Sequence, residues 1–134
     1  MDLLVNIDVP DLAAAEAFYT AAFDLRVTRR FGDGGAELSG LPVRIYLLVK
    51  PEGSLGAAGD LRRYVRHWTP VHLDIVLDDL DAALPQALSA GAHLESEAKT
   101  HAWGRIAVLS DPFGNGLCLL QFLGRGYEEV APAL

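Results

Sequence analysis

Two stretches of the sequence decide the fold: VPDLAAA at Val9–Ala15 and LDDLDAA at Leu77–Ala83. Each follows an alternating apolar run and continues into apolar residues at helical spacing, and the first contains Asp11, which is suited to cap a helix. The two stretches lie about half a chain apart. The sequence therefore predicts two copies of one structural unit.

The first copy is typical of a strand, a helix and three further strands. Residues 3–9 alternate between apolar and polar side chains, which is the period of a strand with two different faces. A helix is expected after the Asp11 cap, and the glycine-rich residues 32–35 predict a hairpin turn. The three later strands are expected at residues 26–31, 36–39 and 43–50.

The second copy repeats that order. Its expected elements are a strand at 71–77, a helix at about 79–90, and strands at 93–98, 105–110 and 116–122. Gly91 is suited to the C-cap of the helix, and Pro85 removes one helical hydrogen bond. The sequence DPFGN at Asp111–Asn115 predicts the turn between the last two strands.

The predicted fold is an α+β domain of two βαβββ repeats. The expected boundaries are a single domain at 1–134, with repeat one at 3–50, a linker at 51–70, repeat two at 71–122 and a tail at 123–134. Glycine and serine make the first part of the linker flexible by composition. Its second part favours a short helix from Asp60 to about Trp68. We expect the helix arginines, Arg62, Arg63 and Arg66, to lie on a solvated face, and an anion or dimer contact is the alternative.

The composition limits the classes of function. The chain has 134 residues, about the usual size of one domain, and 51% apolar residues can supply a buried core. A net charge of -7 argues against nucleic-acid binding led by phosphate contacts. The single cysteine excludes an intramolecular disulfide, and no apolar run reaches the roughly 18 residues of a membrane span. We therefore expect a cytoplasmic protein with neither nucleic-acid nor membrane partners.

The two βαβββ repeats, Asp11-Leu12 followed by Phe18-Tyr19, and the DPFGN turn resemble the vicinal oxygen chelate superfamily. This is the group of glyoxalase I, bleomycin-resistance proteins and extradiol dioxygenases. The resemblance covers residues 3 to about 122. It implies that the repeats form a curved mixed sheet around a ligand cavity, and that two chains pair as a homodimer.

The resemblance also implies metal-ligand positions on the first and last strands of each repeat, usually filled by His, Glu, His and Glu. In this sequence these positions read Leu4, Tyr46, His72 and Cys118. Leucine has no lone pair to donate, and tyrosine is a poor ligand unless its phenol ionises. His72 and Cys118 alone do not make a catalytic zinc or iron site, which needs about three protein donors. We therefore expect the glyoxalase I metal site to be lost and no cofactor to be bound.

A shifted site for a divalent metal remains the alternative. Strand parity places Asn6 and Asp8 on the face of Leu4, and Asp74 on the face of His72. His72 with Asp74, and with Asp8, could hold a cation in a different layer of the sheet.

The candidate ligand-binding residues lie on the strand faces expected to line the cavity and in one nearby loop. They are Asn6, Asp8, Arg44, Tyr46, His72, Asp74, Trp103 and Cys118. His72 fits either a ligand contact or a structural bond to Asp74. Arg44 could neutralise Asp8 or Asp74, or bind a ligand carboxylate through its planar guanidinium. Cys118 is also typical of a small apolar core residue, and no residue is assigned a catalytic role.

Two functions follow from these residues and from the resemblance. The first is the binding of a small organic molecule in the cavity without a catalytic metal, as in the bleomycin-resistance type. The alternative is a metal-dependent lyase, isomerase or dioxygenase with its metal at His72 and nearby carboxylates.

Overall fold

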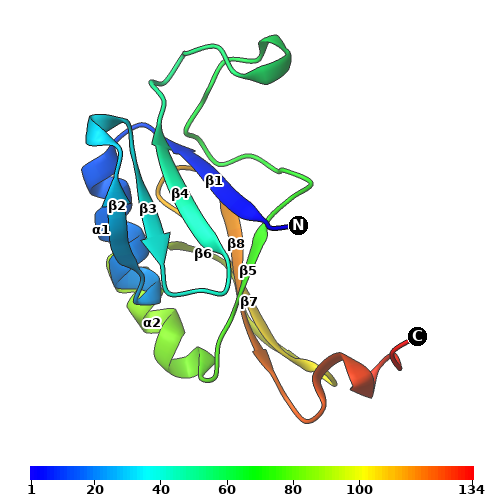
Figure 1. Ribbon diagram of the computed structural model, residues 1–134. Coiled ribbons are helices and arrows are strands. Elements are labelled where there is room, and N and C mark those ends of the chain that lie inside the picture. Colours follow the sequence, from blue (N-terminus) through cyan, green and yellow to red (C-terminus); the bar gives the residue numbers. More distant parts are fainter. The chain divides into compact units, whose positions relative to one another are not determined.

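The predicted repeat is visible in the order of the elements. In the computed structural model, which describes residues 1–134, the chain divides into two units, Met1–Val65 and Arg66–Leu134. Each unit contains one strand, one α-helix and three more strands, in that order (Figure 1). The fold is therefore the predicted α+β arrangement of two βαβββ modules.

The first unit forms a four-stranded sheet in the order β1-β4-β3-β2. Its elements are β1 (Leu4–Val9), α1 (Leu12–Phe23), β2 (Arg26–Arg30), β3 (Gly35–Ser39) and β4 (Arg44–Val49). β1 runs parallel to β4, and the other pairs are antiparallel. The predicted hairpin turn contains a short 3₁₀ turn at Gly32–Gly34.

The two faces of this sheet differ as the alternation predicts. Asp11 caps α1, because its carboxylate accepts a hydrogen bond from the Ala14 backbone N–H at 2.9 Å. The buried side of α1 and one face of the sheet share the core, which includes Val9, Phe18, Tyr19, Leu38, Ile45 and Leu47. The opposite face of the sheet, with Asn6, Asp8, Arg44 and Tyr46, is left for polar side chains.

The second unit repeats this topology in the order β5-β8-β7-β6, with β5 parallel to β8. Its elements are β5 (Leu73–Val76), α2 (Leu80–Ala90), β6 (His93–His101), β7 (Gly104–Ser110) and β8 (Gly116–Phe122). The Asp79 carboxylate caps α2 by accepting from the Ala82 N–H at 3.1 Å. Gly91 ends the helix in the left-handed region at φ 117°, as predicted. Neither α-helix has the length and apolar character that crossing a membrane would require.

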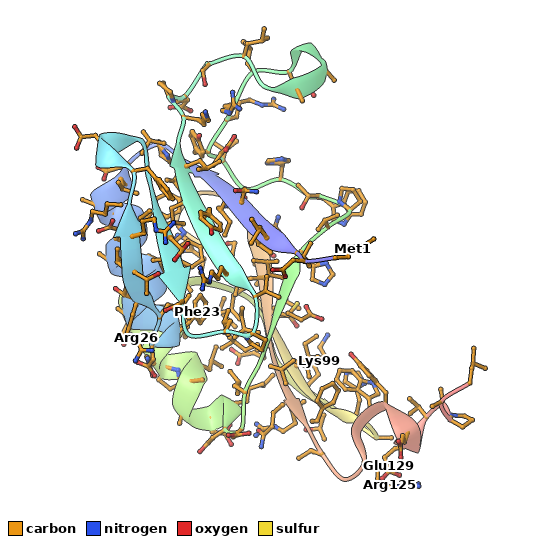
Figure 2. All side chains as sticks on the ribbon, in the orientation of Figure 1. Met1, Phe23, Arg26, Lys99, Arg125 and Glu129 are labelled. Carbon is orange, nitrogen blue, oxygen red and sulfur yellow. The ribbon has the colours of Figure 1, made fainter.

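The C-terminal part of the second unit is more ordered than the sequence indicated. β6 continues to His101 because it stays paired with β7 up to Gly104. Beyond β8 the chain forms a 3₁₀ turn at Gly126–Glu129, where the Arg125 guanidinium lies 3.3 Å from the Glu129 carboxylate (Figure 2).

The helix predicted between Asp60 and Trp68 is wrong. Leu55 and Leu61 instead form an isolated antiparallel bridge. The Arg62 side chain donates a hydrogen bond to the Asp8 carboxylate at 2.6 Å. Arg62 is therefore not on a solvated helix face, because it fastens the segment after β4 to the first strand.

The DPFGN turn is held by a buried carboxylate. Asp111 has a relative exposure of 1%. One of its oxygens accepts from the backbone N–H groups of Phe113 and Asn115, at 2.9 and 2.8 Å. The other accepts from the Asn115 side-chain amide at 2.8 Å. Asp111 is thus a structural residue that sets the connection between β7 and β8.

We expect Asp111→Ala to lower the free energy of unfolding by about 3 kcal/mol, because it leaves the buried Phe113 N–H and the part-buried Asn115 N–H without their carboxylate acceptor. Urea unfolding followed by circular dichroism measures the change. Asp33→Ala, in the exposed turn before β3, is the matched control and should change stability by less than about 0.5 kcal/mol. Equal losses in both variants would contradict the role given to Asp111.

Candidate functional site

The polar face of the first sheet is organised by Glu37, a residue that the sequence analysis did not select. Its side chain is only 4% exposed. It accepts hydrogen bonds from the Tyr46 hydroxyl at 2.7 Å and the Thr28 hydroxyl at 2.8 Å, and the Arg44 guanidinium lies 3.4 Å away. Strand parity could have identified Glu37, because it alternates with the core residues Ala36 and Leu38.

Glu37, Thr28, Arg44 and Tyr46 form the Glu37 cluster. Their contacts set the protonation state of its carboxyl and phenol groups. The hydrogen bond from Tyr46 and the one from Thr28 hold the pKa of Glu37 below its ordinary value, with a smaller contribution from the Arg44 charge. Burial opposes this shift. The bond to Glu37 also raises the pKa of Tyr46. The cluster is therefore an ionised carboxylate with a neutral phenol, and Tyr46 does not present a phenolate to a metal.

Most of the predicted site residues of the first unit therefore already form hydrogen bonds or ion pairs within that unit. Arg44 pairs with Glu37 rather than with Asp8. Asp8 is paired with Arg62 at 2.6 Å, a partner that no local sequence signal could have found. Asn6 is exposed and lies opposite Tyr46 in the β1–β4 register.

The second unit brings together three of the predicted residues. His72 immediately precedes β5, Asp74 lies on β5, and Cys118 lies opposite Asp74 on β8. The His72 Nε2 and Asp74 Oδ1 atoms are 3.2 Å apart. One potential donor atom from each of the three residues lies within 4.8 Å of the others. This group, His72, Asp74 and Cys118, is the donor cluster of the second unit.

The members of the donor cluster differ in exposure. The His72 and Asp74 side chains are 53% and 37% exposed, whereas Cys118 is buried. Burial, reinforced by the neighbouring Asp74 carboxylate, raises the pKa of the Cys118 thiol to about 11. In the absence of a cation, the thiol is therefore protonated at neutral pH and is not an activated nucleophile.

A pocket of about 280 Å³ lies beside the donor cluster. It is lined by Arg66, Trp68, Thr69, His72, Val108, Gly116, Leu117 and Cys118. Trp68 is 80% exposed, so its indole is available to a ligand. Trp68 is not among the ligand-binding residues predicted from the sequence.

Arg66 closes one side of this pocket. Its guanidinium pairs with Glu95, with Nη2 and Oε2 3.0 Å apart, so it is not on a solvated helix face. It packs so close to Gly116 that a Cβ at that position would lie 2.8 Å from Nη2. A side chain at position 116 would therefore push the guanidinium away from the start of β8.

Trp103 does not line this pocket. Its ring stacks on His101 with centroids 5.2 Å apart and lies 5.3 Å from the Tyr127 ring. This aromatic group closes the β6–β7 turn against the C-terminal 3₁₀ turn.

Comparison with known proteins gives the family. The model of the glyoxalase-like domain matches residues 4–120, nearly the whole chain. The protein belongs to the glyoxalase-like domain family. This membership places it in the vicinal oxygen chelate superfamily, as the sequence motifs indicated.

Relatives of this glyoxalase-like protein include one that is similar in sequence and two solved structures that are similar in fold. An uncharacterized protein of Mycobacterium bovis is 30% identical over 115 residues, which cover 82% of this chain and 76% of the relative. A glyoxalase/bleomycin resistance protein/dioxygenase family enzyme of Burkholderia phytofirmans matches with a TM-score of 0.70 and 21% identity, over 92% of this chain and 100% of that one. The fosfomycin resistance protein of Listeria monocytogenes matches with a TM-score of 0.72 and 15% identity, over 96% and 94% of the two chains. These structural likenesses establish the fold and not a substrate.

The residues present do not fit the four-ligand metal set of the superfamily. Leu4 offers no donor atom, and the Tyr46 hydroxyl is used in its bond to Glu37. The donor cluster offers a different set, with one nitrogen, one oxygen and one sulfur in a single unit. Three donors of these kinds fit an ion that keeps an open coordination position.

The Glu37 cluster gives a prediction on pH. Tyr46→Phe removes a hydrogen bond to the ionised carboxylate, which should raise the pKa of Glu37 and lower the melting temperature. Because the folded pKa lies below the unfolded one, this stabilisation is present above the unfolded pKa and is lost as pH falls through the folded pKa. We expect the variant to lose several degrees at about pH 7 and clearly less at about pH 3, measured by calorimetry.

Tyr64→Phe is the matched control. The Tyr64 hydroxyl donates to the Lys50 carbonyl at 2.6 Å, and a carbonyl does not titrate. Its loss of melting temperature should therefore be similar at both pH values. A similar result for Tyr46→Phe would show that ionisation of Glu37 is not involved.

Proposed function

We propose that this glyoxalase-like protein binds a small organic molecule in the pocket of its second unit. The observation that carries the proposal is the exposed Trp68 indole at a pocket whose wall includes the buried Leu117 and Cys118. A flat ligand can stack on an indole and bury apolar surface, while a few polar groups fix its orientation.

The polar groups that border this pocket suit a ligand with hydrogen-bonding groups. His72 and Thr69 are the polar uncharged residues among those that line it. The positive charge of Arg66 is already neutralised by Glu95, so the pocket does not require an anionic ligand. Asp74, beside His72, adds a carboxylate that favours a ligand with a positive or hydrogen-bond-donating group.

The polar face of the first unit is proposed as a supporting ligand surface. Asn6 is its exposed amide, and Tyr46 is half-buried beside Phe31, with ring centroids 6.2 Å apart. To contact a ligand, Asp8 would have to leave Arg62, and Arg44 would have to leave Glu37. We therefore propose that these two residues contribute less to ligand binding.

A second candidate function is a metal-dependent lyase, isomerase or dioxygenase reaction. The donor cluster favours it, because His72 and two further donor atoms lie within reach of one ion. A divalent ion would act there as a Lewis acid next to the pocket.

The two tryptophans allow a sharp test of ligand binding. We expect at least one aromatic probe, from a panel containing benzoate, benzylamine and phenylacetate, to change the fluorescence of Trp103→Phe, in which Trp68 is the remaining tryptophan. The same probe should leave the fluorescence of Trp68→Phe unchanged, because Trp103 lies outside the pocket. Binding should also raise the melting temperature of the unmodified protein. The proposal fails if no probe changes the fluorescence of Trp103→Phe or the melting temperature of the unmodified protein.

We also propose that the protein pairs as a homodimer, as the resemblance to its superfamily implies. Light scattering coupled to size-exclusion chromatography should then give twice the mass of one chain at micromolar concentration. The mass of one chain across the accessible concentration range would contradict this proposal.

A further inference from the structure

The donor cluster combines three chemically different ligands at a place fixed by the backbone. The β5–β8 pairing sets the Cα atoms of Asp74 and Cys118 opposite each other. His72 stands two residues before Asp74, so strand parity sends both side chains to the same face. The parallel ladder thus fixes Asp74 against Cys118, and His72, immediately before β5, brings a third potential donor atom within 4.8 Å of the other two.

We propose that His72, Asp74 and Cys118 bind one thiophilic divalent ion, with Zn²⁺ as the ion of choice, and that Cys118 supplies a thiolate ligand. Imidazole nitrogen, carboxylate oxygen and thiolate sulfur are all zinc ligands, and three protein donors leave one coordination position open. The sulfur selects against Mg²⁺ and Ca²⁺, which prefer oxygen ligands.

The surroundings of the cluster support an ion rather than an inert core cysteine. Both His72 and Cys118 line the pocket, so an ion held by them would face a space that a small molecule can enter. The exposed sides of His72 and Asp74 give the ion a path from solvent. Arg66, which lines the same pocket, is paired with Glu95, so its charge is compensated.

This site differs from the metal set of the superfamily. All its donors come from the second unit, and Leu4 and Tyr46 take no part. Asp74, two residues beyond the position where the superfamily usually places its first ligand, supplies the oxygen, and Cys118 replaces a glutamate with a softer donor. The inference deepens the second candidate function and does not depend on ligand stacking at Trp68.

Cobalt spectroscopy tests the proposal directly. The full chain is freed of metal with a chelator, kept reduced, and titrated with Co²⁺. We expect one equivalent to bind and to produce a near-ultraviolet sulfur-to-cobalt charge-transfer band together with the visible bands of a four-coordinate ion. Zn²⁺ should displace the cobalt stoichiometrically, whereas a large excess of Mg²⁺ should not.

Variants assign the donors. Cys118→Ser should abolish the charge-transfer band, and His72→Ala and Asp74→Asn should each weaken Co²⁺ binding about tenfold or more. His93→Ala, on the exposed edge strand β6 of the same unit, is the matched control and should leave the spectrum unchanged. Circular dichroism checks that each variant is folded.

Measurements on the unmodified protein decide the outcome even if a variant does not fold. X-ray absorption of its zinc-loaded form should show one sulfur among nitrogen and oxygen neighbours. A cobalt spectrum without the charge-transfer band, or zinc with no sulfur neighbour, would overturn the proposal. Trp68→Phe should bind Co²⁺ normally, so a failure of ligand binding and a failure of metal binding can be told apart.

Discussion

The parallel pairing of first and last strands, β1 with β4 and β5 with β8, is the constraint on which each unit depends. The first strand of each unit lies beside its last strand, although the helix and two other strands separate them in the sequence. Residues far apart in the sequence thereby meet on the face of the sheet that the helix does not cover. Asn6 meets Tyr46 in the first unit, and Asp74 meets Cys118 in the second, at equivalent places of the repeat.

The two units use equivalent backbone positions for different chemistry. In the first, Tyr46 donates its hydroxyl to Glu37, and the face becomes a hydrogen-bonded network around one ionised carboxylate. In the second, no buried acid occupies the corresponding strand, and Cys118 faces Asp74 and His72. The duplicated fold therefore carries one polar cluster that is satisfied by its own members and one that has room for an ion or a ligand.

Local patterns predicted the elements well, and their failures have a common cause. Asp11 was expected to cap a helix and does so, because capping needs only a side chain and backbone a few residues away. The helix expected from Asp60 to Trp68 is absent, and the Arg62 side chain instead bonds to Asp8 on β1, a contact between distant segments that a local pattern does not reveal. Strand parity indicates the face of Glu37, but only the paired strands reveal that Tyr46 and Thr28 surround it.

The sequence by itself determined the two βαβββ repeats and the faces of their first strands, because alternation and caps are local properties. Only the tertiary structure decided which charges pair, that Arg66 and Trp68 border a pocket, and that Asp74 joins His72 and Cys118. Those relations depend on strand register and on contacts between distant segments, and the free energy of such contacts is not encoded in any single stretch of residues.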